Sequence, residues 1–158
     1  MQIIEGHNQH PDKPVAIVMS RFNSLVVDNL LRGALDAFKR HGVVASEIAI
    51  IRVPGAFELP LTVQQIAAQK KYAGILALGC VIRGETPHFE YVAGECIKGL
   101  HQISLAHQLP IIMSVLTTDT VEQALDRAGG KAGNKGADGA IALLEMIDLL
   151  KKIPHEEK

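Results

Sequence analysis

Residues 74–92 read GILALGCVIRGETPHFEYV, and this stretch decides the fold. Its first part, Gly74 to Ile82, is an unbroken apolar run of the kind found in strands that are buried on both faces. A polar turn containing Gly84 follows, and from His88 onward apolar residues recur with helical spacing. A buried strand that leads through a short turn into a helix is the building unit of parallel α/β sheets.

Three further apolar runs repeat this pattern: Val15 to Ser20, Ile48 to Val53 and Ile111 to Leu116. Helices are expected at Asn23 to Arg40, Glu58 to Gln69, His88 to Leu109, Asp119 to Ala128 and Ala137 to Lys152. Gly42 is expected to stop the first helix, and Asp119 with Glu122 forms a predicted capping box. Because strands and helices alternate, we expect a single domain over residues 1–158. Its expected fold is a flavodoxin-like, three-layer α/β/α sandwich around a four-stranded parallel sheet.

Both ends of the chain suggest contacts beyond this sandwich. The last helix has an apolar face too wide for one partner, so we expect it to pack against its own core and a second subunit. The residues on that face are Ile141, Leu143, Leu144, Met146, Ile147, Leu149 and Leu150. The short apolar pair Ile3-Ile4 is expected to form a strand that joins its own sheet or the edge of a neighbour's.

Composition excludes several classes of function. Hydrophobic residues make up 47% of the chain and the net charge is −1, so the basic surface that nucleic-acid binding needs is missing. No apolar run reaches the roughly 18 residues of a membrane span. The opening MQIIEGH lacks the features of a signal peptide, so we expect a cytoplasmic protein. Cys80 and Cys96 have no metal-site spacing and are expected to be reduced and buried.

Ligands of parallel sheets bind at the carboxyl ends of the strands, where several side chains attract attention. Phe22 either stacks on a planar ligand or plugs the end of the core. Glu58 either binds hydroxyl or amine groups, or is simply a carboxylate favoured in the first turn of a helix. Arg127, together with Lys131 or Lys135, either binds a phosphate, or these residues are solvated charges on a flexible, glycine-rich turn.

The turn after the third run carries further candidates. Glu85 and Thr86 precede a helix and can present backbone amides to a phosphate. Glu85 stands where a P-loop requires lysine, which argues against nucleoside triphosphate binding. His88 carries an imidazole, a group that suits proton transfer, although an isolated histidine at a helix start is also an ordinary surface residue. Because His101 and His107 do not share a helical face, we expect no metal site.

Together these motifs resemble the lumazine synthase family over nearly the whole chain. The resemblance rests on Arg21-Phe22-Asn23, VPGAFELP at 53–60, GCVIRGETPHFEYV at 79–92, Leu116-Thr117-Thr118, and RAG at 127–129 with GNKG at 133–136. It implies a transferase of riboflavin biosynthesis that condenses 5-amino-6-(ribitylamino)uracil with 3,4-dihydroxy-2-butanone 4-phosphate. The products would be 6,7-dimethyl-8-ribityllumazine, phosphate and water, and no metal or organic cofactor is implied.

The resemblance also implies a role for each site residue. Phe22 would stack on the pyrimidine ring, Ala56, Phe57 and Glu58 would hold the ribityl chain, and Cys80, Val81 and Ile82 would meet the pyrimidine edge through their backbone. Glu85 and Thr86 would bind the phosphate through their amides, His88 would transfer protons, and a neighbouring subunit would supply Arg127 with Lys135 nearby. Many members carry an aromatic residue where this chain has Met113, so here a thioether would cover the ring.

Assembly is part of the resemblance. It implies a homopentamer and, in many members, an icosahedral shell, which the compact turn 133–136 favours here. Ile3-Ile4 would then join a neighbour's sheet, and riboflavin synthase is a candidate partner. Two rival interpretations stay open. A flavodoxin-like flavin carrier would need a phosphate loop that residues 21–23 do not provide, and a shell without catalysis would need neither His88 nor Arg127.

Overall fold

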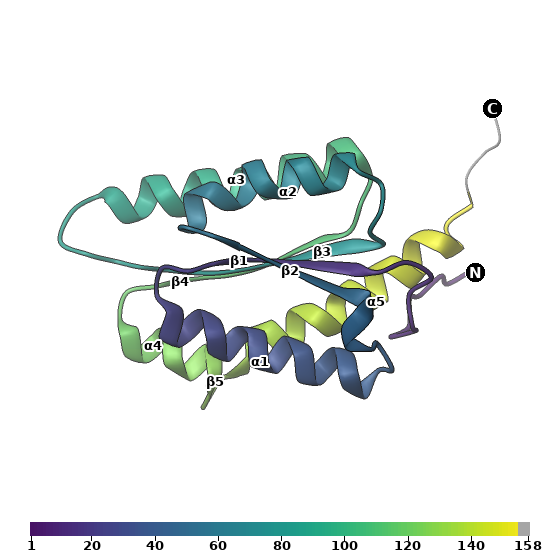
Figure 1. The fold of residues 1–158 in the computed structure, drawn as a ribbon, viewed down its shortest axis with the longest axis horizontal. Coiled ribbons are helices and arrows are strands. Elements are labelled where there is room, and N and C mark those ends of the chain that lie inside the picture. Colours follow the sequence, from purple (N-terminus) through teal and green to yellow (C-terminus); the bar gives the residue numbers. More distant parts are fainter. Residues whose placement is uncertain (155–158) are drawn as a thin grey trace.

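A sheet of parallel strands forms the centre of the molecule (Figure 1), in a computed structural model that describes residues 1–154. The strands are β1 (Val15–Ser20), β2 (Ile48–Val53), β3 (Gly74–Ile82) and β4 (Ile111–Thr118), and their order across the sheet is β2-β1-β3-β4. The predicted four-stranded parallel sheet is therefore confirmed, although β4 continues past its predicted end at Leu116. The predicted domain runs to residue 158, and residues 155–158 lie outside the described part.

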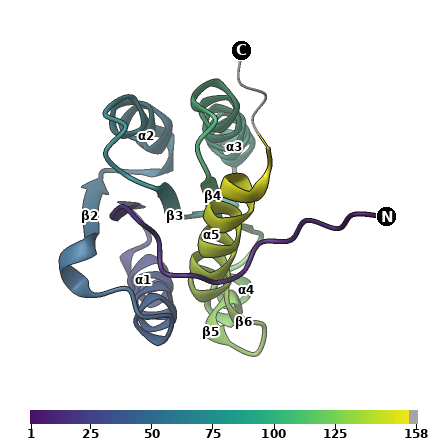
Figure 2. The same cartoon turned by 90° about the vertical axis from the view of Figure 1, so that its right-hand side faces the viewer.

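Helices cover both faces of this sheet (Figures 1 and 2). One face carries α1 (Ser24–Arg40), α4 (Val121–Arg127) and α5 (Lys135–Lys152), and the other carries α2 (Leu59–Ala68) and α3 (His88–His107). Short 3₁₀ helices, η1 (Ala45–Glu47) and η2 (Ala56–Glu58), precede β2 and α2. This is the predicted three-layer sandwich. Within residues 1–154, no helix has both the length and the apolar character that crossing a bilayer requires.

The two central strands are buried on both faces, which explains why their apolar runs do not alternate. Side chains of Ile17 and Leu76 pack among the α1 and α5 residues, whereas Val18 and Ile75 pack among those of α2 and α3. Each face of the sheet therefore has its own hydrophobic core. Strands with a core on both sides read as continuous apolar sequence, as the prediction assumed.

The order of the strands places a switch point between β1 and β3. From β1 the chain first moves outward to β2 and then returns to the other side of β1 to form β3. The last pair between the two central strands is Met19 with Leu78, so residues 79–82 of β3 run on beyond the end of β1. Ligands of open parallel sheets bind in the crevice at such a point. The fold thus directs the search for a site to this edge.

Helix ends confirm one prediction and correct another. Gly42 adopts a positive φ of 85° just after α1, as predicted for its stop. The predicted capping box of Asp119 and Glu122 is wrong. Thr120 caps α4 by accepting a hydrogen bond from the backbone N–H of Gln123, whose side chain accepts from the backbone of Asp119. The cap therefore lies one residue later in the chain, and the bond from Gln123 returns to the residue before the cap.

A short hairpin connects α4 to α5 in place of a flexible turn. Strand β5 (Ala128–Gly130) pairs in antiparallel fashion with β6 (Gly133–Asn134), and neither strand was predicted. Gly129 and Gly133 take positive φ angles of 110° and 74°, which residues with a side chain rarely adopt. Strands this short carry no periodic pattern in the sequence.

The N-terminal segment crosses α5 (Figure 2). A Cβ on Gly6 would lie 2.1 Å from the carbonyl oxygen of Glu145, and the amide of His7 donates to Asp148 at 2.7 Å. Part of the wide face of α5 is therefore covered by the chain's own first residues. Ile3-Ile4 forms no strand with the chain's own sheet within residues 1–154, and its pairing with a neighbour's sheet stays a prediction.

Both cysteines belong to the buried cores. Cys80 is 3% exposed and Cys96 is 0% exposed, and both are free thiols, as predicted. Burial raises the pKa of each thiol to about 11. The pKa of each thiol is higher in the folded chain than in the unfolded chain, so folding favours the protonated thiol. The contribution of the thiols to the free energy of unfolding is therefore complete below the unfolded pKa and is lost as pH rises toward 11.

We therefore expect a thiol reagent at pH 8 to label the native protein slowly and the denatured protein completely. Unfolding midpoints in denaturant should fall as pH rises from about 9 to 11. An added surface thiol, Leu105→Cys, is the control for reagent access, because Leu105 is 66% exposed. Rapid labelling of both native thiols would contradict the burial described here.

Candidate active site

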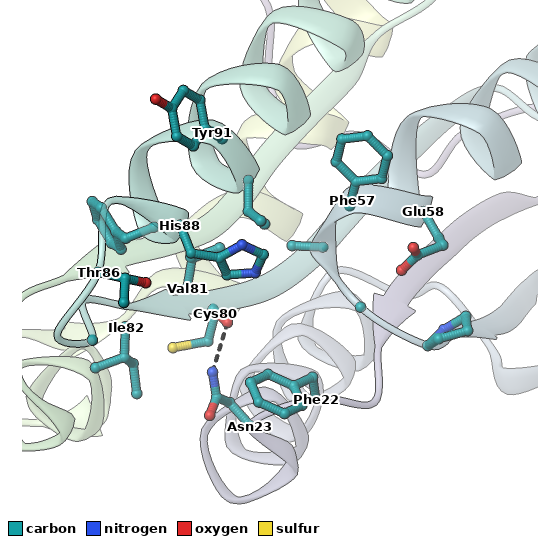
Figure 3. Close-up of a pocket in the computed structure, with 16 residues that line it drawn as sticks. Phe22, Asn23, Phe57, Glu58, Cys80, Val81, Ile82, Thr86, His88 and Tyr91 are labelled. Carbon is teal, nitrogen blue, oxygen red and sulfur yellow. Dashed lines mark hydrogen bonds between the residues drawn. The ribbon is translucent and has the colours of Figure 1, made fainter.

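A cavity of about 700 Å³ opens at the switch point between β1 and β3 (Figure 3). Its walls come from the turns after β1 and β2, the end of β3 and the start of α3. Most of the predicted site residues line it: Phe22, Ala56, Phe57, Glu58, Cys80, Val81, Ile82, Thr86 and His88. The fold thus gathers motifs that are far apart in the sequence into one space.

Phe22 stands at the cavity as an exposed ring. It is 71% exposed in the chain, so it does not plug the end of the core. Its backbone amide donates to the carbonyl of Pro54 at 3.1 Å, and that of Arg21 donates to Val53 at 2.8 Å. These bonds continue the pairing of β1 with β2 past the strand ends and hold the backbone of Phe22 at the mouth of the cavity (Figure 3).

Asn23 is a lining residue that the sequence analysis did not single out as a site residue. It adopts a left-handed conformation with φ 58° and ψ 43° before α1, and its side-chain amide donates to the carbonyl of Cys80 at 2.9 Å. Asparagine is enriched in this conformation, so its place directly after a buried strand was the available signal. The bond ties the start of α1 to the free end of β3.

The end of β3 presents backbone to the cavity while its side chains belong to the cores. Cys80 packs into the core on the α1 and α5 side, and Val81 packs into the core on the α2 and α3 side. The raised pKa of the Cys80 thiol, caused by burial, keeps it neutral at physiological pH. Cys80 is therefore no nucleophile at neutral pH, and a ligand at this edge meets peptide groups.

Glu58 lies at the opposite wall, next to the first turn of α2. It closes the 3₁₀ turn η2 and is the N-cap of α2, with Pro60 in the first turn. A Cβ on Gly55 would lie 3.1 Å from the carboxylate of Glu58, so a side chain at position 55 would crowd this carboxylate. The side chain both sits at a helix start and lines the cavity, which is compatible with each of its two interpretations.

His88 is the first residue of α3 and its imidazole points into the cavity (Figure 3). Within residues 1–154 neither ring nitrogen has a hydrogen-bond partner, so both can meet a ligand. Thr86 and Gly84 of the preceding turn also line the cavity. Glu85 does not line it and is exposed, so of the two residues predicted to hold a phosphate only Thr86 lies at the cavity wall.

Met113, Arg127 and Lys135 lie in a second, separate cavity of about 440 Å³. It opens on the far side of the edge strand β4, between this strand, the end of α4 and the start of α5, and shares no lining residue with the first cavity. The guanidinium of Arg127 donates to the carbonyl of Gln123 at 3.0 Å, and Lys135 pairs with Asp138 at 2.8 Å. One chain therefore keeps its predicted phosphate-binding cations apart from His88.

Buried polar contacts fix the start of α5 beside this second cavity. The Ser114 hydroxyl donates to the carbonyl of Lys135 at 2.8 Å, and the side chain of Asn134 accepts from the amides of Gly136 and Ala137. The Asn134 amide also donates to the carbonyl of Asn29 in α1 at 3.0 Å. The backbone that carries Lys135 is thereby anchored to both β4 and α1.

Among residues 1–154, no three His, Cys, Asp or Glu side chains gather so as to hold a metal ion. The groups that the two cavities offer include aromatic rings, peptide edges, carboxylates, an imidazole and two cations. This set suits a planar polar ligand, a proton transfer and a phosphate.

The family model described as 6,7-dimethyl-8-ribityllumazine synthase matches residues 12–151, a span that includes every segment lining the two cavities. This match confirms the resemblance found in the motifs. The chain belongs to the 6,7-dimethyl-8-ribityllumazine synthase family.

Proposed function

We propose that the chain condenses 5-amino-6-(ribitylamino)uracil with 3,4-dihydroxy-2-butanone 4-phosphate to 6,7-dimethyl-8-ribityllumazine, phosphate and water. The family supports this transferase reaction of riboflavin biosynthesis. The observation that carries the proposal is the cavity at the switch point, where the exposed ring of Phe22, the peptide edge of β3 and the imidazole of His88 face one space. The proposal covers residues 1–158 as one domain.

The pyrimidine substrate would lie between Phe22 and the end of β3. Beyond Leu78 the β1 side of β3 has no strand partner, and Asn23 occupies only the carbonyl of Cys80. Peptide N–H and C=O groups of Cys80, Val81 and Ile82 would match the alternating donors and acceptors on the edge of a uracil ring. Ala56, Phe57 and Glu58 would hold the ribityl chain, with the carboxylate accepting from its hydroxyls.

The phosphate would be held from two sides. The amides of Glu85 and Thr86 precede α3, where free N–H groups favour an anion. Arg127 of a neighbouring subunit would bind the phosphate through its guanidinium fork, with Lys135 adding charge. Because these cations line a different cavity from His88 in the same chain, the proposed site needs two subunits, and Met113 would come with them.

The proposed reaction needs little catalysis by side chains. The amine and the ketone form an imine with loss of one water, phosphate is eliminated, and the ring closes with loss of a second water. Holding two reactants in contact is worth up to roughly 7–11 kcal/mol, because it makes a bimolecular step effectively unimolecular. His88 would move protons between these intermediates, and a general acid–base contributes about 10²–10⁴-fold in rate.

We further propose that the enzyme works in the cytoplasm, where its two free cysteines stay reduced, as a homopentamer that closes into an icosahedral shell. The compact hairpin from β5 to β6 supports the shell, because it carries no insertion. Riboflavin synthase, which would consume the product, is the candidate partner.

The direct test mixes the two substrates with the purified protein and follows the absorbance of the lumazine product. We expect lumazine and phosphate to appear in equal amounts, without added metal or cofactor. A protein that binds the uracil substrate and forms no lumazine would be a binding or shell protein, and the proposal would be wrong.

For His88→Ala we expect single-turnover rates about 10²-fold lower, with residual activity that remains measurable because proximity contributes most of the acceleration. Affinity for both substrates should change little. The control is His101→Ala, an exposed histidine of the same helix that does not line the cavity. A His88→Ala variant that binds both substrates normally and has no activity at all would contradict this division of labour.

For Arg127→Ala we expect the KM of the phosphate substrate to rise about 10- to 100-fold, the size of one charged hydrogen-bonding contact. The KM of the uracil substrate should stay close to its normal value. Lys131→Ala removes a cation from the turn of the same hairpin, outside the second cavity, and serves as the control. Equal losses in the two variants would mean that only general charge matters at this hairpin.

A further inference from the structure

Arg83 lies directly after β3 and outside the cavity. It contacts the end of β4 and the start of α3, which lie beside the turn that follows it. The turn of residues 83–87 carries Gly84 and Thr86 at the cavity wall and leads into His88. The side chain of Arg83 does not line the cavity. Its side chain instead contacts the residue after β4 and the first turn of α3.

The backbone and side chain of Arg83 together make four contacts. Its amide donates to the carbonyl of Thr118 at 2.9 Å, and its Nε donates to the carboxylate of Asp119 at 2.8 Å. Its Nη1 donates to the carboxylate of Glu90 at 3.1 Å. The guanidinium carbon also lies 4.4 Å from the ring centroid of Phe89.

These contacts link three separate segments through one planar group. Asp119 belongs to the turn after β4, whereas Phe89 and Glu90 are in the first turn of α3, next to His88. The fixed fork of a guanidinium can satisfy two carboxylates at once and stack on a ring, which the single charge of a lysine cannot do. The hydrogen bonds to Asp119 and Glu90 raise the pKa of Arg83 above its usual value.

We propose that Arg83 is a positioning residue, which holds the turn 83–87 and the first turn of α3 so that Thr86 and His88 face the cavity. This inference rests on the proposed function, because it assigns the turn to the phosphate substrate. The side chain of Arg83 is 42% exposed, and exposed ion pairs contribute little to global stability. Removing it should therefore disturb the turn and leave the rest of the fold in place.

The test compares Arg83→Gln, Arg83→Lys and Asp119→Asn in the full-length protein. In Arg83→Gln we expect the KM of the phosphate substrate to rise about tenfold, because small misplacements of a binding group have large effects. The KM of the uracil substrate should change less than about twofold, because its proposed contacts lie elsewhere in the cavity. Arg83→Lys should be intermediate, and Asp119→Asn should shift the same KM in the same direction.

The control is Arg40→Gln, which breaks the exposed pair of Arg40 with Asp36 at the end of α1, and we expect unchanged kinetics. The double variant Arg83→Gln with Asp119→Asn should resemble Arg83→Gln alone, since both substitutions remove one network. Hydrogen exchange at the amides of residues 84–86 and of His88 should be faster in Arg83→Gln, with a thermal midpoint within a few degrees of the wild type.

Either of two results would overturn the inference while leaving the proposed function intact. One is an active wild type whose KM for the phosphate substrate is unchanged in Arg83→Gln and Asp119→Asn. The other is an equal rise in both KM values together with a large fall in the thermal midpoint. A wild type that forms no lumazine would overturn the proposed function and this inference with it.

Discussion

The pairing of β1 with β3 ends at Met19 and Leu78, while β3 continues to Ile82, and the site depends on this difference in length. The overhang is held at its free end by the side chain of Asn23 and on its other side by β4. It leaves peptide groups without a strand partner at the point where the strand order reverses. Burial of the preceding residues on both faces keeps this backbone rigid, so a flat polar ligand meets a preformed edge.

A single chain holds two half-sites that it cannot bring together. The imidazole of His88 faces the cavity at the switch point, and Arg127 and Lys135 line another cavity beyond the edge strand β4. In the proposed reaction the phosphate substrate needs groups from both cavities. Assembly then becomes a requirement of the chemistry, because each subunit supplies the imidazole of one site and the guanidinium of the next. A head-to-tail interface of this kind closes into a ring when its rotation allows, and the proposed homopentamer would be such a ring.

The sequence was most informative where burial alone sets the pattern. Continuous apolar runs predicted all strands of the main sheet, since a core on each face removes alternation. The sequence could not predict contacts between distant segments. Arg83 contacts Asp119, which lies 36 positions later in the chain, and nothing local indicates that these turns adjoin. Exposure likewise excluded a core role for Phe22 only once the core was seen to close without it. Asn23 and the hairpin from β5 to β6 were missed because a single dihedral and two very short strands leave no periodic signal.

The most direct measurement mixes subunits that carry His88→Ala with subunits that carry Arg127→Ala and follows lumazine formation after reassembly. A site shared between neighbours pairs an intact imidazole with an intact guanidinium in about a quarter of randomly formed interfaces. With the phosphate substrate kept well below the wild-type KM, the account therefore predicts activity near a quarter of the wild type, well above the mean of the two separate variants. Activity equal to that mean would contradict it, because His88 and Arg127 would then not meet across the interface between neighbouring subunits.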